Sequence, residues 1–329
     1  MTTRFSSRRA LLQAALGAAA LPAFAQGAYP NKPIHLVVPF TPGGSTDILA
    51  RAIGQELTKA WGQAVVIENV PGAGGSIGAE KVAKAAADGY TLLMGHIGTL
   101  GVNPSLYPKL GYDPVKSFAP VAWVARVPNV LAVHPSVPAK DFKEFIELAR
   151  SQPGRLNYGS GGNGSAAHTA TEYLKLVTRT SLLHIPYRGT APAVNDLLAG
   201  NIQLLFTGAP ALLNHLKAGK LRALAVSSPK RLSLLPDVPT VAESGVTGTQ
   251  GFEADQWYGI VAPAGTPPAV VQALNEQVNK SLTSPDVRSR LVAEGAEPTP
   301  TTPQAFGQLI ASEIRRWAPV VKAGNIKAE

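Results

Sequence analysis

Residues 34–53 read IHLVVPFTPGGSTDILARAI, and this stretch decides the fold class. It begins with a strand-like apolar run, residues 34–40, and is then broken by Gly43 and Gly44. Apolar residues recur at helical spacing over residues 48–57. A strand, a glycine-rich turn and a helix in this order form a βα unit, so the stretch predicts an α/β protein.

The same alternation continues along most of the chain, which predicts βα units with mainly parallel sheets. The C-terminal part differs, because its helical patterns follow one another and the last two have no strand between them. The further expected strands cover residues 64–68, 91–94, 121–124, 130–133, 156–158, 183–185, 204–206, 221–226 and 258–261. The further expected helices cover residues 77–87, 142–150, 166–177, 193–198, 210–218, 268–282, 287–294 and 303–323.

The length of 329 residues indicates two domains, because a single hydrophobic core stops growing at about 250–300 residues. The order of the units suggests that one domain is built from both ends of the chain and that the other is inserted between them. We expect domain 1 to comprise residues 29–125 and 250–329, and domain 2 to comprise residues 126–249. Two short links between them would form a hinge.

The composition excludes several classes of protein. Hydrophobic residues make up 45% of the chain and charged residues 16%, which excludes a disordered chain. The absence of cysteine excludes disulfides and thiol chemistry. None of the six histidines has the spacing of a metal-binding pair, so we expect no metal and no cofactor. The net charge is +9, but the basic residues are scattered, so we expect no nucleic-acid partner.

Residues 1–25 read as an export signal. Three arginines, including the pair Arg8–Arg9, precede an apolar stretch that is too short to span a membrane. Ala23-Phe24-Ala25 then supplies a small-residue cleavage pattern before Gln26. The arginine pair is compatible with a twin-arginine signal or with an ordinary secretory signal. Either interpretation predicts an exported protein, periplasmic in a Gram-negative host.

Three glycine-rich loops, residues 40–47, 69–78 and 158–168, each lie between a strand and a helix. A helix N-terminus offers unpaired N–H groups and a partial positive charge, and glycines let a ligand approach the backbone closely. Such loops can bind an anion without lysine or arginine. They can also serve only as turns and helix caps. His96 and His168 lie beside these loops and are candidate donors to a carboxylate.

Two enzyme patterns have partial matches. Residues 74–78 fit the G-x-S-x-G pattern of serine hydrolases around Ser76, but seven residues separate Ser76 from the strand, whereas a nucleophile elbow follows its strand directly. Residues 159–164 fit the dinucleotide-binding G-x-G-x-x-G pattern, but residues 178–188 lack the acidic residue that would bind the ribose. A secreted hydrolase that uses Ser76 therefore stays an alternative, and a dinucleotide cofactor is not expected.

Several longer segments carry a family resemblance. They include PFTPGGSTDILAR (39–51), VVIENVPGAGGSIGAE (65–80), YGSGGNGSAAH (158–168), IPYRGTAPAVNDLLAGNI (185–202) and WYGIVAPAGTP (257–267). In this order they resemble the Bug family of extracytoplasmic solute receptors, the binding components of tripartite tricarboxylate transporters. The resemblance implies a two-domain clamshell of the periplasmic-binding-protein (type II-like) fold. It also implies a monomer that performs no chemistry, binds a small carboxylate and meets either the membrane components of such a transporter or a sensor protein.

The resemblance also implies a set of ligand-binding residues. The first domain would supply Thr41, Gly43, Gly44, Ser45, Thr46, Asp47, His96 and Thr99, and the second Ser160, Gly161, Asn163, Gly164, Ser165, His168, Arg188, Thr207 and Gly208. One position departs from the family pattern, because Gln203 stands where the family often has Asp. The loss of that charge bears on which ligand is accepted.

Overall fold

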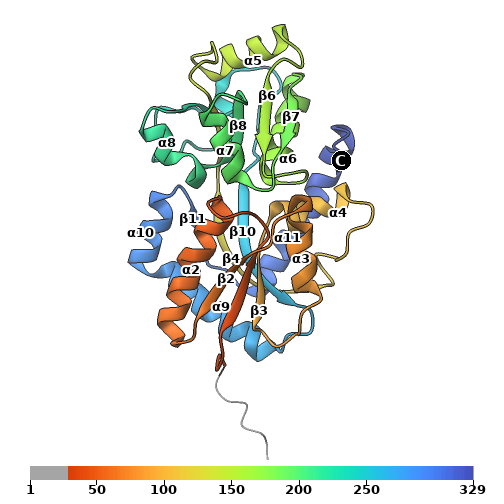
Figure 1. Cartoon of the computed structure of the whole chain (residues 1–329), viewed down its shortest axis with the longest axis vertical. Coiled ribbons are helices and arrows are strands. Elements are labelled where there is room, and N and C mark those ends of the chain that lie inside the picture. The colour runs from red at the N-terminus through yellow and green to blue at the C-terminus, as the bar shows by residue number, and fades with distance from the viewer. Residues whose placement is uncertain (1–28, 329) are drawn as a thin grey trace, which may run out of the picture.

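The computed structural model describes residues 29–328, so the export signal predicted for residues 1–25 lies outside the described residues. The chain forms two lobes, one above the other in Figure 1, and each lobe is built on its own β-sheet. We call them the first lobe, which has six strands, and the second lobe, which has five. No helix among residues 29–328 is long and apolar enough to cross a membrane.

The sheet of the first lobe has the strand order β11-β4-β10-β3-β1-β2. β1 runs parallel to both β2 and β3, as the βα pattern predicted. β10 runs antiparallel to β3 and β4, and β11 antiparallel to β4. The strands are β1(Ile34–Val38), β2(Val65–Asn69), β3(Thr91–His96), β4(Phe118–Val127), β10(Gln256–Pro263) and β11(Glu297–Pro298).

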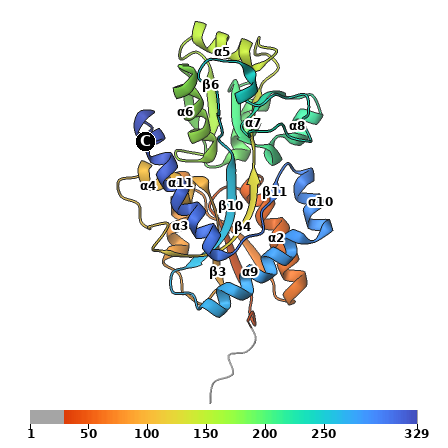
Figure 2. The ribbon, with the colours of Figure 1, turned by 180° about the vertical axis from the view of Figure 1, so that it is seen from behind.

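Helices cover both faces of this sheet. Successive side chains of β1 point to opposite faces. Leu36 packs in the core with α2, α9 and α10, and Val37 packs in the core with α3 and α11. Figure 2, which views the molecule from behind, shows α11 on the near side of this sheet, where it packs against β4. The helices are α2(Ser45–Trp61), α3(Ser76–Ala83), α4(Asn103–Leu106), α9(Pro268–Thr283), α10(Pro285–Ala293) and α11(Pro303–Ala323), with the 3-10 turn η1(Ala73–Gly75) and the π-helical turn η2(Gly98–Val102).

The sheet of the second lobe has the strand order β7-β6-β8-β5-β9. β6 runs parallel to β7 and β8, and β5 runs antiparallel to β8 and β9. Its strands are β5(Asn129–Val133), β6(Asn157–Ser160), β7(Leu183–Pro186), β8(Leu204–Gly208) and β9(Arg222–Val226).

This second sheet is also covered on both faces. Leu131 of β5 packs in one core with α5 and α6, and its neighbour Val130 packs in another core with α7 and α8. The strands are thus buried on both sides, which accounts for their nearly continuous apolar runs. The helices are α5(Phe142–Ser151), α6(Ala166–Thr178), α7(Thr190–Leu198) and α8(Leu213–Lys217), with the 3-10 turns η3(Ala209–Ala211) and η4(Ala242–Ser244).

The chain crosses between the two sheets at Pro128, between β4 and β5, and again just before β10. The two crossings are bonded to each other, because the backbone N–H of Asn129 donates to Ser227 Oγ at 2.8 Å and Asn129 Nδ2 donates to the Ala254 oxygen at 2.6 Å. Arg126 Nε lies 2.7 Å from Asp255 Oδ2 at the same level. Two short, adjacent crossings have the geometry of a hinge. We retain residues 29–125 with 250–329, and residues 126–249, as the proposed domain limits.

The predicted α/β architecture is confirmed, with corrections in detail. Both sheets are mixed rather than mainly parallel, because the strands next to the crossings run antiparallel to their neighbours. A two-residue strand, β11, does lie between α10 and α11. Helix α3 ends at Ala83 instead of continuing to residue 87, and the helix expected over 210–218 is a 3-10 turn followed by the short α8.

Candidate functional site

A small cavity of about 20 Å³ lies where the loops of the two lobes meet. The first lobe contributes residues from the ends of β1 and β3, from the start of α2 and from β10, and the second lobe contributes the starts of α6 and α7 and the end of β8. We call it the inner cavity. Its lining consists of Phe40, Gly44, Thr46, His96, Ser165, Ala166, Ala167, Thr190, Thr207, Gln256 and Tyr258.

Three helix N-termini converge on the inner cavity. Gly44 is the N-cap of α2, Ser165 is the N-cap of α6, and Thr190 is the first residue of α7. The first N–H groups of a helix have no partner within the helix, and the helix dipole places a partial positive charge there. Three such ends around one cavity favour an anion.

Two hydroxyl groups of the first lobe are buried at the seam without a hydrogen-bond partner among the described residues. They are Thr41 Oγ1 and Ser45 Oγ, and the whole Ser45 residue is only 4% exposed. Each lies against a glycine of the second lobe, since a Cβ added at Gly189 would be 2.0 Å from Thr41 Oγ1 and one added at Gly208 would be 2.7 Å from Ser45 Oγ. A buried hydroxyl without a partner costs about 1–3 kcal/mol. These two hydroxyls are therefore candidate donors to a ligand held between the lobes.

His96 lines the inner cavity as a neutral ring. Its Nδ1 accepts a hydrogen bond from the Thr99 N–H at 3.1 Å, which leaves the ring proton on Nε2. Burial lowers the pKa of His96 to about 4. The side chain can thus donate a hydrogen bond to a ligand at neutral pH, but it carries no charge there. The Thr99 hydroxyl in turn donates to the His96 backbone oxygen.

Asp47 is buried beside the site, but its carboxylate is already fully engaged. Oδ2 accepts hydrogen bonds from the Gly43 N–H and from Arg51 Nε, both at 3.0 Å, and Oδ1 accepts one from Asn69 Nδ2 at 3.0 Å. Burial alone would raise the pKa of Asp47, but these hydrogen bonds outweigh it and hold the pKa below its ordinary value. The carboxylate therefore stays charged and fixes the loop before α2.

The second lobe supplies the loop Ser160–Ser165, which we call the binding loop. The Ser165 hydroxyl accepts from the His168 N–H and so caps α6. Ser160 Oγ accepts from the Gly162 N–H at 3.1 Å and lies 2.6 Å from His184 Nε2. The Gly164 N–H donates to His168 Nδ1 at 3.0 Å. His168 lies outside the lining of the inner cavity and supports the binding loop instead.

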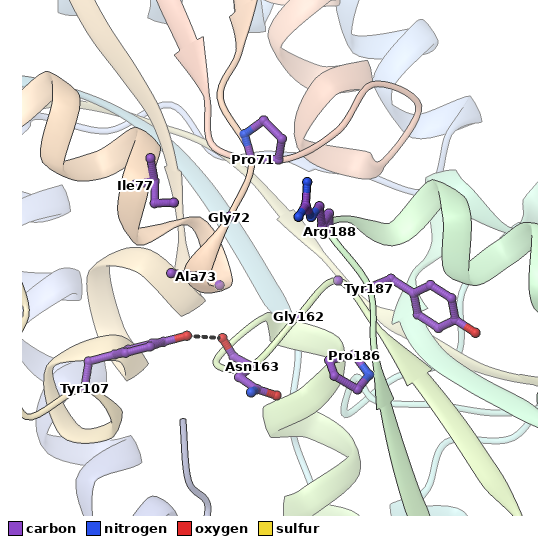
Figure 3. A pocket seen from close by; sticks show the side chains of 12 residues that line it. Pro71, Gly72, Ala73, Ile77, Tyr107, Gly162, Asn163, Pro186, Tyr187 and Arg188 are labelled. Carbon is purple, nitrogen blue, oxygen red and sulfur yellow. Dashed lines mark hydrogen bonds between the residues drawn. The ribbon is translucent and has the colours of Figure 1, made fainter. Parts of the chain in front are cut away.

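A larger cavity of about 520 Å³ opens beside the binding loop, and we call it the outer cavity (Figure 3). Tyr107 of the first lobe donates to the Asn163 backbone oxygen across it at 2.9 Å. Arg188 is exposed and has no ion-pair partner among residues 29–328. The Tyr187 ring points away from the cavity, and its hydroxyl donates to Asp196 Oδ2. The lining is Pro71, Gly72, Ala73, Gly74, Ile77, Tyr107, Gly161, Gly162, Asn163, Pro186, Tyr187 and Arg188.

The structure distributes the residues predicted from the sequence over both cavities. Gly44, Thr46, His96, Ser165 and Thr207 line the inner cavity, and Gly161, Asn163 and Arg188 line the outer one. The others lie behind the lining, where they orient it or close the seam: Thr41, Gly43, Ser45, Asp47, Thr99, Ser160, Gly164, His168 and Gly208.

Sequence reasoning missed Gln256 and Tyr258, which face the inner cavity from β10. The Tyr258 hydroxyl donates to Gln256 Oε1, and Gln256 Nε2 donates to Asn129 Oδ1 at the crossing. The only signal was the presence of polar side chains on a buried strand. Sequence reasoning also missed the wall that residues 71–74 form, although the second glycine-rich loop itself was recognised.

Ser76 lies at the start of α3, where its hydroxyl accepts a hydrogen bond from Asn103 Nδ2 at 2.9 Å. An amide N–H cannot act as the general base that a serine nucleophile requires. In the described part of the chain, no group of three or more His, Asp or Glu side chains could hold a metal ion. The described residues that line the inner cavity offer helix N-termini and the neutral donor His96.

Comparison with known proteins gives concordant matches. A family model described as tripartite tricarboxylate transporter family receptor matches residues 49–326. The protein BugT of Bordetella pertussis is 41% identical over 300 residues, which are 91% of either chain. The R. palustris protein Rpa4515, solved with adipate, has a TM-score of 0.88 at 41% identity, over 91% of this chain and 99% of that one. MatC of Rhodopseudomonas palustris, solved with malate, has a TM-score of 0.85 at 38% identity, over 89% and 100%.

Proposed function

Because the chain belongs to the tripartite tricarboxylate transporter receptor family, we propose that it captures a small organic carboxylate between its two lobes. The resemblance to the Bug family noted in the sequence is confirmed. Within the proposal, the protein is exported and holds its ligand for the membrane components of such a transporter. A sensing role, in which a signalling protein reads the liganded form, uses the same site.

The main observation behind the proposal is that the N-termini of α2, α6 and α7 converge on the inner cavity. The unpartnered hydroxyls of Thr41 and Ser45 lie behind its lining at the same seam. Of the described residues that line this cavity, none has a formal charge at neutral pH, since His96 is a neutral donor. Such a site favours an anion through N–H and O–H donors. The relatives solved with adipate and malate hold anions of this kind.

The size of the inner cavity indicates that binding involves the hinge. Its volume of about 20 Å³ corresponds to one water molecule and is too small for a carboxylate. The lobes must therefore separate about the crossings at Pro128 and Asp255 to admit a ligand, and they then close on it. Gln256 lines the cavity and also bonds the crossing residue Asn129, so it lies on the path between ligand and hinge.

The distal part of the ligand would extend into the outer cavity. Its lining combines apolar side chains such as Pro71 and Ile77 with polar ones, and Arg188 is a cation without an ion-pair partner in the described chain. A dicarboxylate places one carboxylate among the helix N-termini and directs its other end toward this wider space. The proposal therefore favours di- and tricarboxylates over acetate-sized acids.

A binding assay with matched ligands tests the proposal. The chain from Gln26 onward is unfolded and refolded to remove carried-over ligand, and its melting temperature is measured with adipate, malate, citrate, benzoate and glutamate. The diamides of adipate and malate serve as controls, since they keep the shape and lose the charge. A ligand at 100 times its dissociation constant stabilises the fold by about 2.7 kcal/mol.

A shift with at least one acid and none with its amide supports the proposal. If the folded protein responds to no acid, or responds equally to acid and amide, the carboxylate assignment is wrong. The hydrolase alternative is tested on the same sample with nitrophenyl esters. Turnover that disappears in Ser76→Ala would establish an enzyme in place of a receptor.

A further inference from the structure

Two imidazole rings lie stacked against each other next to the binding loop. His168 comes from α6 and His184 from β7. Their ring centroids are 4.1 Å apart and their planes differ by 6°. The Tyr158 ring also stacks on His184, at 4.8 Å. Neither histidine lines the inner or the outer cavity. The stacked pair thus lies outside the ligand space described above.

Each ring of the pair holds a different part of the binding loop. His184 Nε2 lies 2.6 Å from Ser160 Oγ, and the same hydroxyl accepts the Gly162 N–H. His168 Nδ1 accepts the Gly164 N–H at 3.0 Å. The pair therefore contacts the loop directly at Ser160 and Gly164, and it reaches Gly162 only through Ser160 Oγ.

These contacts determine where the loop meets the ligand and the other lobe. The residues between the anchored ones, Gly161 and Asn163, face the outer cavity, and Ser165 faces the inner one. The Asn163 backbone oxygen also receives the Tyr107 hydroxyl from the first lobe. A loop released from the histidines would lose its place in both cavities and in this contact.

We propose that His168 and His184 act together as positioning residues, which hold the binding loop in its binding geometry only while both rings are neutral. A protonated His168 carries a hydrogen on Nδ1 and cannot accept the Gly164 N–H. Two cationic rings at this separation would also repel each other. The consequence for ligand affinity rests on the proposed function, whereas the hold on the loop does not.

The charged and titratable groups that face the pair are few. They are Tyr158 from β6 and Glu172 and Lys175 from α6. Glu172 accepts a hydrogen bond from the Tyr158 hydroxyl and forms an ion pair with Lys175 at 2.6 Å, so Lys175 offsets its negative charge. Burial, with a smaller effect of Lys175, lowers the pKa of His168 to about 4. Burial is also the main cause that lowers the pKa of His184 to about 3, with His168 and Lys175 lowering it and Glu172 raising it. Both rings are thus neutral at pH 7, and the loop is released as the pH falls through about 4.

Paired substitutions separate the effect of the hydrogen bonds from the effect of side-chain volume. In His168→Asn the amide oxygen replaces the Nδ1 acceptor, and in His184→Gln the amide group can pair with Ser160 Oγ in place of Nε2. The leucine variants at both positions remove these hydrogen-bonding groups. The readout is the hydrogen-exchange protection of the amides in residues 160–165 at pH 7, measured by NMR without ligand. We expect His168→Leu to lower the protection of Gly164, and His184→Leu that of Gly162, by about tenfold.

The Asn and Gln variants should keep that protection within about threefold, which corresponds to less than one hydrogen bond. His134→Leu is the matched control, because His134 is a partly exposed histidine of the same lobe that bonds Ser136 instead of the binding loop. Unchanged protection in both leucine variants, or equal loss in leucine and amide variants, would show that the rings do not position the loop.

An acid titration tests the requirement for neutral rings. In the wild-type protein the protection factors of the binding loop should drop as the pH falls from 5 to 3.5, in step with the imidazole ¹⁵N signals. The double variant His168→Asn/His184→Gln has no ring to protonate and should keep its protection. Loss of protection in both proteins at the same pH would overturn the proposal. This comparison stands even if the leucine variants do not fold.

Ligand binding is measured last, with adipate and malate as probes at pH 7. A dissociation constant at least about tenfold weaker in His168→Leu, with recovery in His168→Asn, links the loop to the site. If the wild-type protein binds neither probe nor any other carboxylate, the proposed function fails and the exchange data still decide the role of the pair. If it binds them and His168→Leu binds equally well, the positioning role is wrong.

Discussion

The hydroxyl of Tyr107 in the first lobe donates a 2.9 Å hydrogen bond to the backbone oxygen of Asn163 in the second lobe. This contact joins the lobes at the outer cavity, in addition to the two crossings of the chain. It can form only when the lobes are together. The bond therefore contributes to the closed arrangement, by about 0.5–1.5 kcal/mol for a typical hydrogen bond.

Replacement Tyr107→Phe should weaken ligand binding about two- to tenfold, because closure loses this bond while the ring is kept. The dissociation constant for a carboxylate found in the binding assay measures the effect. The matched control is Tyr29→Phe, which removes a 2.7 Å bond to the Gly89 oxygen within the first lobe. Tyr29→Phe should lower thermal stability and leave affinity unchanged. Equal affinities in all three proteins would exclude a role of this contact in closure.

Removal of the unpartnered hydroxyls should have opposite effects on stability and on affinity. Ser45→Ala or Thr41→Val deletes a buried donor without a protein partner, so the free energy of unfolding without ligand should stay equal or rise. Affinity for a carboxylate should fall about tenfold or more, since a hydrogen bond to a charged group contributes about 1.5–3 kcal/mol. Urea unfolding and calorimetric titration measure the two quantities.

Thr299→Val provides the control for the hydroxyl variants. The Thr299 hydroxyl is also buried without a partner in the described chain, but it follows β11 and lines neither the inner nor the outer cavity. We expect the same gain in stability and no change in affinity. A loss of affinity at Thr299 as large as at Thr41 would mean that the effect is general and not due to the site.

A negative charge at position 165 should abolish binding. Both aspartate and asparagine can cap α6 in place of the serine, so Ser165→Asp and Ser165→Asn should fold equally well. Only the aspartate places a like charge next to the bound carboxylate. We expect Ser165→Asn to bind within about tenfold of the wild-type protein and Ser165→Asp to show no binding in titration. Retained affinity in Ser165→Asp would remove the binding loop from the site.

The buried His96 predicts how stability depends on pH. Its pKa is about 4 in the fold, against about 6.5 in the unfolded chain, so between these values the unfolded chain binds the proton more readily. The free energy of unfolding contributed by His96 is complete above pH 6.5 and is lost as the pH falls toward 4, by about 1.4 kcal/mol per pH unit.

His96→Asn keeps an acceptor for the Thr99 N–H and removes this titration. Urea unfolding between pH 7 and 4.5 should therefore show a shallower pH dependence in His96→Asn than in the wild-type protein. His35→Asn, at an exposed position of β1, should keep the wild-type slope. Identical slopes for wild type and His96→Asn would contradict the burial of a neutral ring.

Much of the fold was predictable because both sheets are buried on two faces. Strands such as β5 and β8 are mostly apolar runs, and Gly208 marks the end of β8. The strand β11 was missed because two residues, Glu297 and Pro298, carry no periodic pattern. The antiparallel course of β10 was missed because a sequence pattern shows where a strand lies but does not determine which strands it pairs with or in which direction.

The site was predictable only in part, for a related reason. The first and third glycine-rich loops follow strands and start helices, and this local signal located Gly44, Thr46 and Ser165. Gln256 and Tyr258 reach the inner cavity from a strand near the other end of the chain. Their position depends on the pairing of β10 with β3, a contact over more than 150 residues that no local pattern encodes.

No described residue that lines the inner cavity carries a formal charge at neutral pH. This predicts how the dissociation constant of the ligand depends on the salt concentration. Mobile ions screen exposed charge pairs over about 8 Å at physiological ionic strength, whereas fixed dipoles buried around a ligand are screened far less. Capture by helix ends and hydroxyls should therefore keep nearly the same dissociation constant from dilute to concentrated salt. Release of a carboxylate from the inner cavity then requires no ion pair to break, and only a contact of the ligand with Arg188 in the outer cavity should weaken with salt.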